Sequence, residues 1–191
     1  LAKKNGNLVL GLVNTVGSSI ARETEAGVYN HIGPEVGVGS TKAFTSQLAV
    51  LVLFALFFSQ ERRAVLDSSS LLQGDKVLFP SEAKKIIKGL YLLPSQIKKI
   101  LKKERAIEEL AKKYSAYNNF LYIGRNYNYP IAMEGALKLK EIAYCNAQGY
   151  AAGEMKHGPI ALVDKNFPTV AIVGSPISHT YEKIVSNIEE I

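Results

Sequence analysis

The stretch FLYIGRNYNYPIAMEGALKLKEIAY, residues 120–144, decides the fold of this chain. Its first five residues form a short apolar run of the kind that becomes a buried parallel strand. Residues 125–129 follow as a polar loop, and Pro130 suits the first position of a helix, where no N–H donor is needed. Residues 131–144 then predict a helix. A strand that leads directly into a helix is the repeating unit of α/β proteins.

The same alternation recurs on both sides of this stretch. Residues 8–13 and 169–174 are apolar runs with turn signals beside them, and residues 27–30 predict another brief strand. Ser18 or Ser19 could cap a short helix after the first run, and residues 178–191 read as a last helix. We therefore expect an α/β fold in which parallel sheets are flanked by helices in three layers.

The middle of the chain reads as helical and basic. Residues 81–89 and 94–114 predict two amphipathic helices. Residues 81–113 hold ten Lys or Arg against four Glu, and that excess of six equals the net charge of the whole chain. No groove-reading motif or aromatic-interleaved basic stripe accompanies it, so we interpret it as a solvated linker face and expect no nucleic-acid partner.

The longest apolar run, residues 48–58, has eleven residues, fewer than the roughly 20 that span a bilayer. It predicts a buried core helix with polar first turns at residues 41–47, and no membrane partner. The single cysteine, Cys145, excludes an internal disulfide, fits a reducing compartment, and is read as a small buried side chain. No signal peptide is visible. We expect the chain to be truncated at both ends, because both begin or stop within helical patterns.

The predicted helix at 131–144 carries the first candidate site. Helical spacing places Glu134, Lys138 and Glu141 on one face. Such a face is often only an ordinary surface, where an i,i+4 pair contributes a few tenths of a kcal/mol. Here the helix follows a strand, so its start lies at the carboxyl edge of the sheet, where α/β proteins bind ligands. Two carboxylates around an ammonium could move protons at a small substrate.

Two further segments add candidate residues. His157 lies in an irregular, glycine-flanked segment. The ordinary pKa of a histidine side chain, about 6.5, suits proton transfer at neutral pH. Residues 33–41 are rich in glycine and lead into the long apolar helix, with Ser40 and Thr41 where an N-cap belongs. Free N–H groups at such a helix start would favour an anion, although a plain loop is equally compatible with the pattern. No metal-binding cluster is visible, and we expect no cofactor.

Four motifs in order resemble the isomerase half of the glutamine–fructose-6-phosphate aminotransferase family. They are NTVGSSI at 14–20, GVGSTKAFTSQ at 37–47, EGALKLKE at 134–141 and AGEMKHGPIALVD at 152–164. The resemblance implies two partial sugar-isomerase (SIS) subdomains, at residues 1–60 and 118–191, joined by a helical linker region at 61–117. It also implies conversion of fructose 6-phosphate and glutamine-derived ammonia to glucosamine 6-phosphate and glutamate, in the cytoplasm.

The resemblance assigns separate roles to the candidates. Glu141 would move a proton between C1 and C2 of the sugar, Lys138 would stabilise the developing oxygen charge, and Glu134 would orient His157. In this family the histidine opens the sugar ring and reaches the neighbouring subunit's site, so a homodimer is implied. Binding of the sugar phosphate would fall to the loop, at Glu35, Val38, Gly39, Ser40 and Thr41.

Parts of the family pattern lie outside these residues, namely the phosphate loop, the imine-forming lysine and the glutaminase domain. Gly39 also stands where the family usually has alanine. We therefore expect the 191 residues alone to be inactive. The alternatives are another SIS-family sugar-phosphate isomerase or amino-sugar deaminase, or a non-catalytic SIS domain that senses a hexose phosphate.

Overall fold

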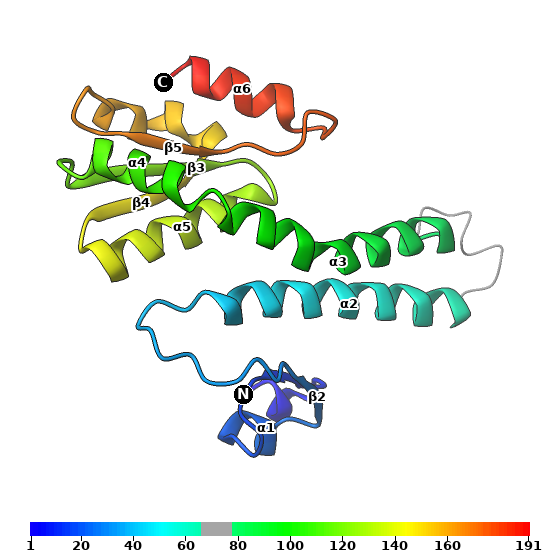
Figure 1. Cartoon of the computed structure of the whole chain (residues 1–191). Helices are drawn as coiled ribbons and strands as arrows, with labels where there is room; N and C mark the ends of the chain where they lie inside the picture. The colour runs from blue at the N-terminus through cyan, green and yellow to red at the C-terminus, as the bar shows by residue number, and fades with distance from the viewer. Residues whose placement is uncertain (66–77) are drawn as a thin grey trace. The chain divides into compact units, whose positions relative to one another are not determined.

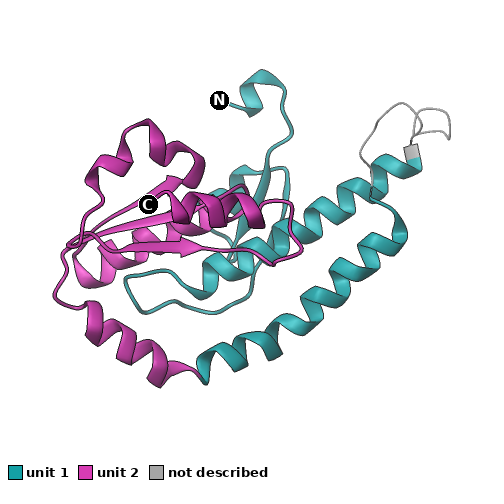
Figure 2. Cartoon of the chain, turned by 90° about the horizontal axis from the view of Figure 1, so that it is seen from above, with its two compact units in different colours: residues 1–102 teal, residues 103–191 magenta. Residues whose placement is uncertain are grey.

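The computed structural model describes residues 1–65 and 78–191, which divide into two compact units, Leu1–Lys102 and Lys103–Ile191. Figure 2 shows the two units in different colours. Both contain parallel strands joined through helices, so the predicted α/β fold class is confirmed.

The second unit is built on a parallel sheet in the order β4–β3–β5. Along the chain its elements are α4 (Glu104–Tyr114), β3 (Asn119–Gly124), α5 (Asn128–Ala143), β4 (Asn146–Ala151), the 3-10 turns η3 (Ala152–His157) and η4 (Pro159–Leu162), β5 (Thr169–Ile172) and α6 (Tyr181–Glu189). Helices α5 and α6 lie on opposite faces of the sheet (Figure 1). The unit therefore has the expected three layers.

Alternating residues of β3 fill the two halves of this unit's core, because successive side chains of a strand point to opposite faces. Leu121 and Ile123 pack with Met155 of η3 and Ile184 of α6, and all four are at most 1% exposed. Phe120 packs on the other face with Ala136 of α5. The central strand thus holds both helical layers to the sheet.

Strand β4 was not predicted from the sequence. Its residues, NAQGYA, include asparagine and glycine, which are uncommon in strands. Six consecutive residues nevertheless pair in parallel with β3, from Asn119↔Asn146 to Gly124↔Ala151. Pairing with the buried central strand outweighs the weak local preference.

The first unit contains a smaller parallel pair, β1 (Leu10–Val13) and β2 (Ala26–Tyr29), with η1 (Lys3–Asn5) before it and α1 (Ser19–Glu23) between the strands. Ser18 caps α1, as predicted, because its Oγ accepts a hydrogen bond from the Ala21 N–H at 3.3 Å. The strands are where the pattern placed them, but the expected burial is wrong: in β1 only Gly11 is buried.

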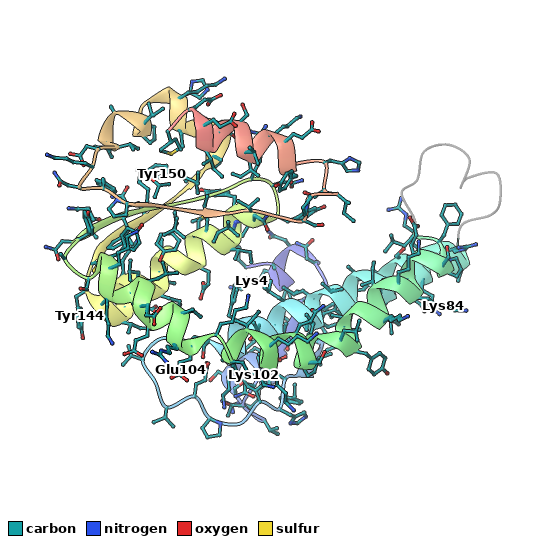
Figure 3. All side chains as sticks on the ribbon, turned by 45° about the horizontal axis from the view of Figure 1, so that its top comes forward. Lys4, Lys84, Lys102, Glu104, Tyr144 and Tyr150 are labelled. Carbon is teal, nitrogen blue, oxygen red and sulfur yellow. The ribbon has the colours of Figure 1, made fainter. Side chains whose placement is uncertain are left out.

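Two long helices complete the first unit, α2 (Lys42–Val65) and α3 (Pro80–Leu101). We predicted a helix break between residues 89 and 94, and this is wrong: α3 runs through Pro94 and ends at Leu101. The apolar residues Ile86, Leu93 and Ile97 lie on one face across the proline, since they are spaced by seven and four positions. Lys84 near the start of α3 and Lys102 just after its end both belong to the basic stretch at residues 81–113 (Figure 3).

Helix α2 contradicts the expectation of a buried core helix. Leu51, Leu53 and Phe57 are 53%, 48% and 54% exposed, and only 6% of the most apolar 18-residue window is buried. By length and composition alone the helix could cross a membrane from Lys42 to Ala64, but core helices of soluble proteins meet the same criterion.

Candidate active site

Glycines place α5 against its sheet at unusually short range. A Cβ built on Gly149 of β4 would lie 2.7 Å from the Cα of Met133, and one on Gly124 would lie 2.1 Å from the carbonyl oxygen of Asn128. Gly135 of α5 in turn lies against the ring of Tyr122. The helix can approach this closely only because these positions carry no side chain.

The charged face of α5 points away from the sheet. Ala132 and Ala136 are 0% and 1% exposed and face the strands. At 100° per residue, Glu134, Lys138 and Glu141 lie on the opposite side of the helix. Their side chains are still only 21–29% exposed.

The structure joins these three predicted residues into one group. Lys138 Nζ donates a hydrogen bond to Glu141 Oε2 at 2.6 Å and lies 3.3 Å from Glu134 Oε1. The hydrogen bond to Glu141, together with Glu134, holds the pKa of Lys138 above its usual range, although partial desolvation opposes this. The ammonium therefore stays charged at neutral pH.

His157 is placed apart from this group. It is exposed at the end of η3, where Gly158 follows at φ 146°, a conformation that favours glycine. Within the described part of the chain, no hydrogen bond or ion pair joins it to Glu134, Lys138 or Glu141. The expected irregular segment is wrong, because His157 is the last residue of the 3-10 helix η3, and the chain itself does not bring it to the α5 face.

The glycine-rich loop in the first unit is organised by Glu35. Its carboxylate accepts hydrogen bonds from the backbone N–H groups of Thr41 at 2.8 Å and Ala43 at 3.3 Å, and from the Ser40 hydroxyl at 3.0 Å. These bonds, chiefly the one from Thr41, hold the pKa of Glu35 below its ordinary value. Val38 at the loop tip is 91% exposed.

Glu35 changes the interpretation of this loop. We expected free N–H groups at the start of α2 to be available to a ligand anion and Ser40 or Thr41 to cap the helix. Instead the carboxylate of Glu35 occupies that position and acts as the cap. A negative charge is favourable there because of the helix dipole. Glu35 therefore shapes the loop, while Val38 and Gly39 remain at its tip.

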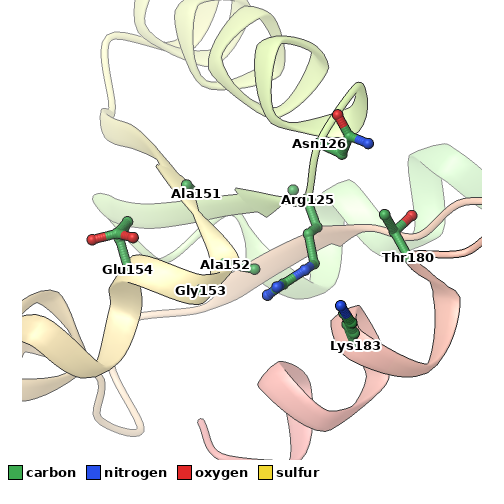
Figure 4. Close-up of a pocket in the computed structure, with 9 residues that line it drawn as sticks. Arg125, Asn126, Ala151, Ala152, Gly153, Glu154, Thr180 and Lys183 are labelled. Atoms are coloured by element: carbon green, nitrogen blue, oxygen red, sulfur yellow. The ribbon is translucent and has the colours of Figure 1, made fainter. Parts of the chain in front are cut away.

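The carboxyl edge of the second sheet holds a cavity that the sequence analysis missed. Its volume is about 380 Å³, and its walls come from the segments after β3, β4 and β5. They are Gly124, Arg125, Asn126, Ala151, Ala152, Gly153, Glu154, Thr180 and Lys183 (Figure 4). None of the α5 group lines it. Among residues 1–65 and 78–191, no cluster of three or more His, Cys, Asp or Glu is placed to hold a metal ion.

Comparison with known proteins finds a matching family, similar sequences and a similar solved structure. The SIS domain model matches residues 1–57 and 113–189. The chain is 46% identical over 191 residues to glutamine–fructose-6-phosphate aminotransferase [isomerizing] of Bacteroides thetaiotaomicron, covering 29% of that protein, and 44% identical over 171 residues to human form 2, covering 23%. The solved C-terminal domain of glucosamine-fructose-6-phosphate aminotransferase from Francisella tularensis superimposes with a TM-score of 0.87 at 36% identity, over 99% of this chain and 49% of that one. The chain thus spans less than a third of these curated relatives.

Proposed function

The chain belongs to the SIS-domain family, and on that premise we propose that it forms part of the isomerase region of an isomerizing glutamine–fructose-6-phosphate aminotransferase. In this proposal the complete protein converts fructose 6-phosphate and ammonia, released from glutamine by a region outside these residues, to glucosamine 6-phosphate in the cytoplasm. The observation that carries the proposal is the α5 group, in which one ammonium bridges two carboxylates.

Glu141 is the proposed base. Its Oε2 accepts the hydrogen bond from Lys138, and among the described residues no donor is bound to Oε1. That oxygen is free to take the proton from C1 of the C2-imine formed by the ketose and ammonia. Returning it to C2, while the proton of the C1 hydroxyl is transferred to the imine nitrogen, completes the isomerisation without net loss or gain of protons, and Glu141 carries out the carbon-to-carbon transfer.

Lys138 is the proposed electrostatic partner. As the proton returns to C2, the C1 hydroxyl loses its own proton, and a fixed cation stabilises the negative charge that develops on that oxygen. Because the two carboxylates raise its pKa, Lys138 acts as a charged donor and not as a base. Glu134 holds the ammonium from the other side and is proposed to orient His157 in the assembled enzyme.

The remaining candidates are assigned to substrate binding and assembly. Exposed His157 is proposed to open the sugar ring in the neighbouring subunit of a homodimer. Ser40, Thr41 and the backbone at Val38 and Gly39 would contact the sugar phosphate, with Glu35 holding their loop in shape.

The proposal is tested in a full-length protein that carries this chain. Incorporation of deuterium from solvent at C1 of fructose 6-phosphate reports the proton step directly. We expect Glu141→Gln to slow it by about 10²–10⁴-fold, while the affinity for fructose 6-phosphate changes by less than about threefold, since a neutral amide of similar shape replaces the base. Glu182→Gln on α6, on the opposite face of the sheet, is the matched control and should leave both values unchanged.

Other outcomes assign other functions. Binding of fructose 6-phosphate without any wild-type exchange would make the domain a sensor. Exchange without glutamine-dependent formation of glucosamine 6-phosphate would favour a different SIS isomerase or a deaminase. We expect the 191 residues alone to form no glucosamine 6-phosphate, and detectable product would contradict this.

A further inference from the structure

The cavity at the carboxyl edge of β3 and β4 gathers positive charge that the proposed function does not use. Arg125 follows β3 and Lys183 lies in the first turn of α6. In Figure 4 the Arg125 side chain turns toward Gly153 and the ammonium of Lys183 points up into the same cavity, whereas the carboxylate of Glu154 points away. Two like charges in one cavity repel, and a bound anion would relieve that repulsion.

Arg125 is held in place by an uncharged partner. Its Nη1 donates a hydrogen bond at 2.9 Å to Oδ1 of Asn187, which is 9% exposed, and Asn187 in turn donates to Glu190 at 3.3 Å. No carboxylate of the described chain forms an ion pair with Arg125 or Lys183. The guanidinium is thus fixed without being neutralised, and its remaining N–H groups are available to a ligand.

The backbone leaves room for this arrangement. A Cβ on Gly153 would lie 3.0 Å from Arg125 Nη1, so glycine lets the guanidinium lie close to the start of η3. The cavity also lies where the strand order turns: the segment after β3 leads to α5 on one face of the sheet, and the segment after β5 leads to α6 on the other. Open α/β sheets bind ligands at such crevices.

We propose that this cavity binds the phosphate group of a small phosphomonoester, with Arg125 and Lys183 as its cationic ligands and Thr180 in the cavity wall. An arginine fork matches phosphate geometry, and lysine adds a point charge. A volume of about 380 Å³ admits a phosphorylated sugar as well as the bare anion. This site and the α5 group share no residue, so either assignment can fail without the other.

The test is titration of the isotope-labelled chain with inorganic phosphate, a hexose 6-phosphate and a nucleoside diphosphate, followed by NMR at the amides of Gly124, Arg125, Gly153 and Lys183. We expect phosphate and the hexose phosphate each to shift the resonances of these amides, and the shifts should saturate as the ligand concentration rises. Lys183→Gln should weaken both affinities about tenfold, the effect of losing one charge-assisted hydrogen bond. Lys165→Gln removes the same charge from an exposed loop of the same unit and should change neither.

Two further variants make the test decisive. Gly153→Ala should also weaken binding, because it displaces Arg125 and leaves every charge in place. Lys138→Gln should leave phosphate binding intact. Loss of binding in Lys138→Gln with retention in Lys183→Gln would overturn this proposal and leave the α5 function standing. Equal loss in both the Lys183 and Lys165 variants, no wild-type shifts, or tighter binding of the diphosphate than of the hexose phosphate would each overturn it too.

Discussion

Replacing Gly149 by alanine tests whether the close contact between β4 and α5 limits the stability of the second unit. The new Cβ would lie 2.7 Å from Met133 Cα, 0.7 Å short of the 3.4 Å at which ordinary contact begins. Two of the three nearest atoms, Met133 Cα and N, belong to helix backbone and cannot rotate away. Overpacking of this kind costs about 1–3 kcal/mol, and the lower entropy of the unfolded chain returns about 0.4–1 kcal/mol. We expect a net loss of about 1–2 kcal/mol.

Native-state hydrogen exchange measures this loss locally. The amide of Leu121 is bonded to the carbonyl of Pro168 at 3.0 Å, and its side chain is 0% exposed, so it exchanges only when the sheet opens. Its exchange should accelerate about 5–30-fold in Gly149→Ala. Gly89→Ala in α3 is the control, because a Cβ there meets nothing within 4 Å; it should stabilise the helix by about 0.5–1 kcal/mol. Unchanged exchange at Leu121 would refute the reasoning.

Three smaller predictions concern charge and capping. The pKa of Glu35 is lowered in the folded state, so its ionised form stabilises the protein above its ordinary pKa, and this is lost as pH falls through the folded value. The difference in urea midpoint between wild type and Glu35→Gln should therefore be full at pH 6 and shrink as pH falls below the ordinary value of 4.5. The pKa of Lys138 is raised, so its contribution is complete below its ordinary pKa and lost only as pH rises through the folded value. The difference between wild type and Lys138→Met should be constant from pH 7 to 9 and shrink only as pH rises above the ordinary value of 10.5, and a decline already at pH 8 would contradict the ion pair. Ser18→Ala should destabilise α1 by about 1 kcal/mol, seen as faster exchange of the amide that Ser18 caps, while Ser19→Ala should have a smaller effect.

The second sheet was partly predictable because its local signals and its packing agree. The apolar run at 120–124 is β3, and the helix predicted at 131–144 is α5 at Asn128–Ala143. Pro130 is the third residue of this helix, whereas the first position was expected. A proline is tolerated there because the first turn's N–H groups have no acceptor within the helix. Strand β4 could not be predicted, since its pairing with β3 depends on contacts between segments 27 residues apart.

The candidate site divides in the same way. Helical spacing was enough to group Glu134, Lys138 and Glu141, because all three lie on one helix. Arg125 and Lys183 are 58 residues apart and meet only because α6 packs on the sheet, so no spacing rule could have joined them. Glu35 had a signal that was missed: a carboxylate shortly before a helix start is a natural cap.

The glycine contacts of α5 also bear on motion during a reaction cycle. Because Gly124, Gly135 and Gly149 seat the helix directly on its neighbours, α5 should move together with β3 and β4 on the microsecond-to-millisecond timescale of domain motions, and not slide over them. The three charged groups would then keep their mutual geometry throughout. Whatever rearrangement admits and releases a substrate would fall to segments outside this helix, such as the exposed tip at Val38 and the turn at His157.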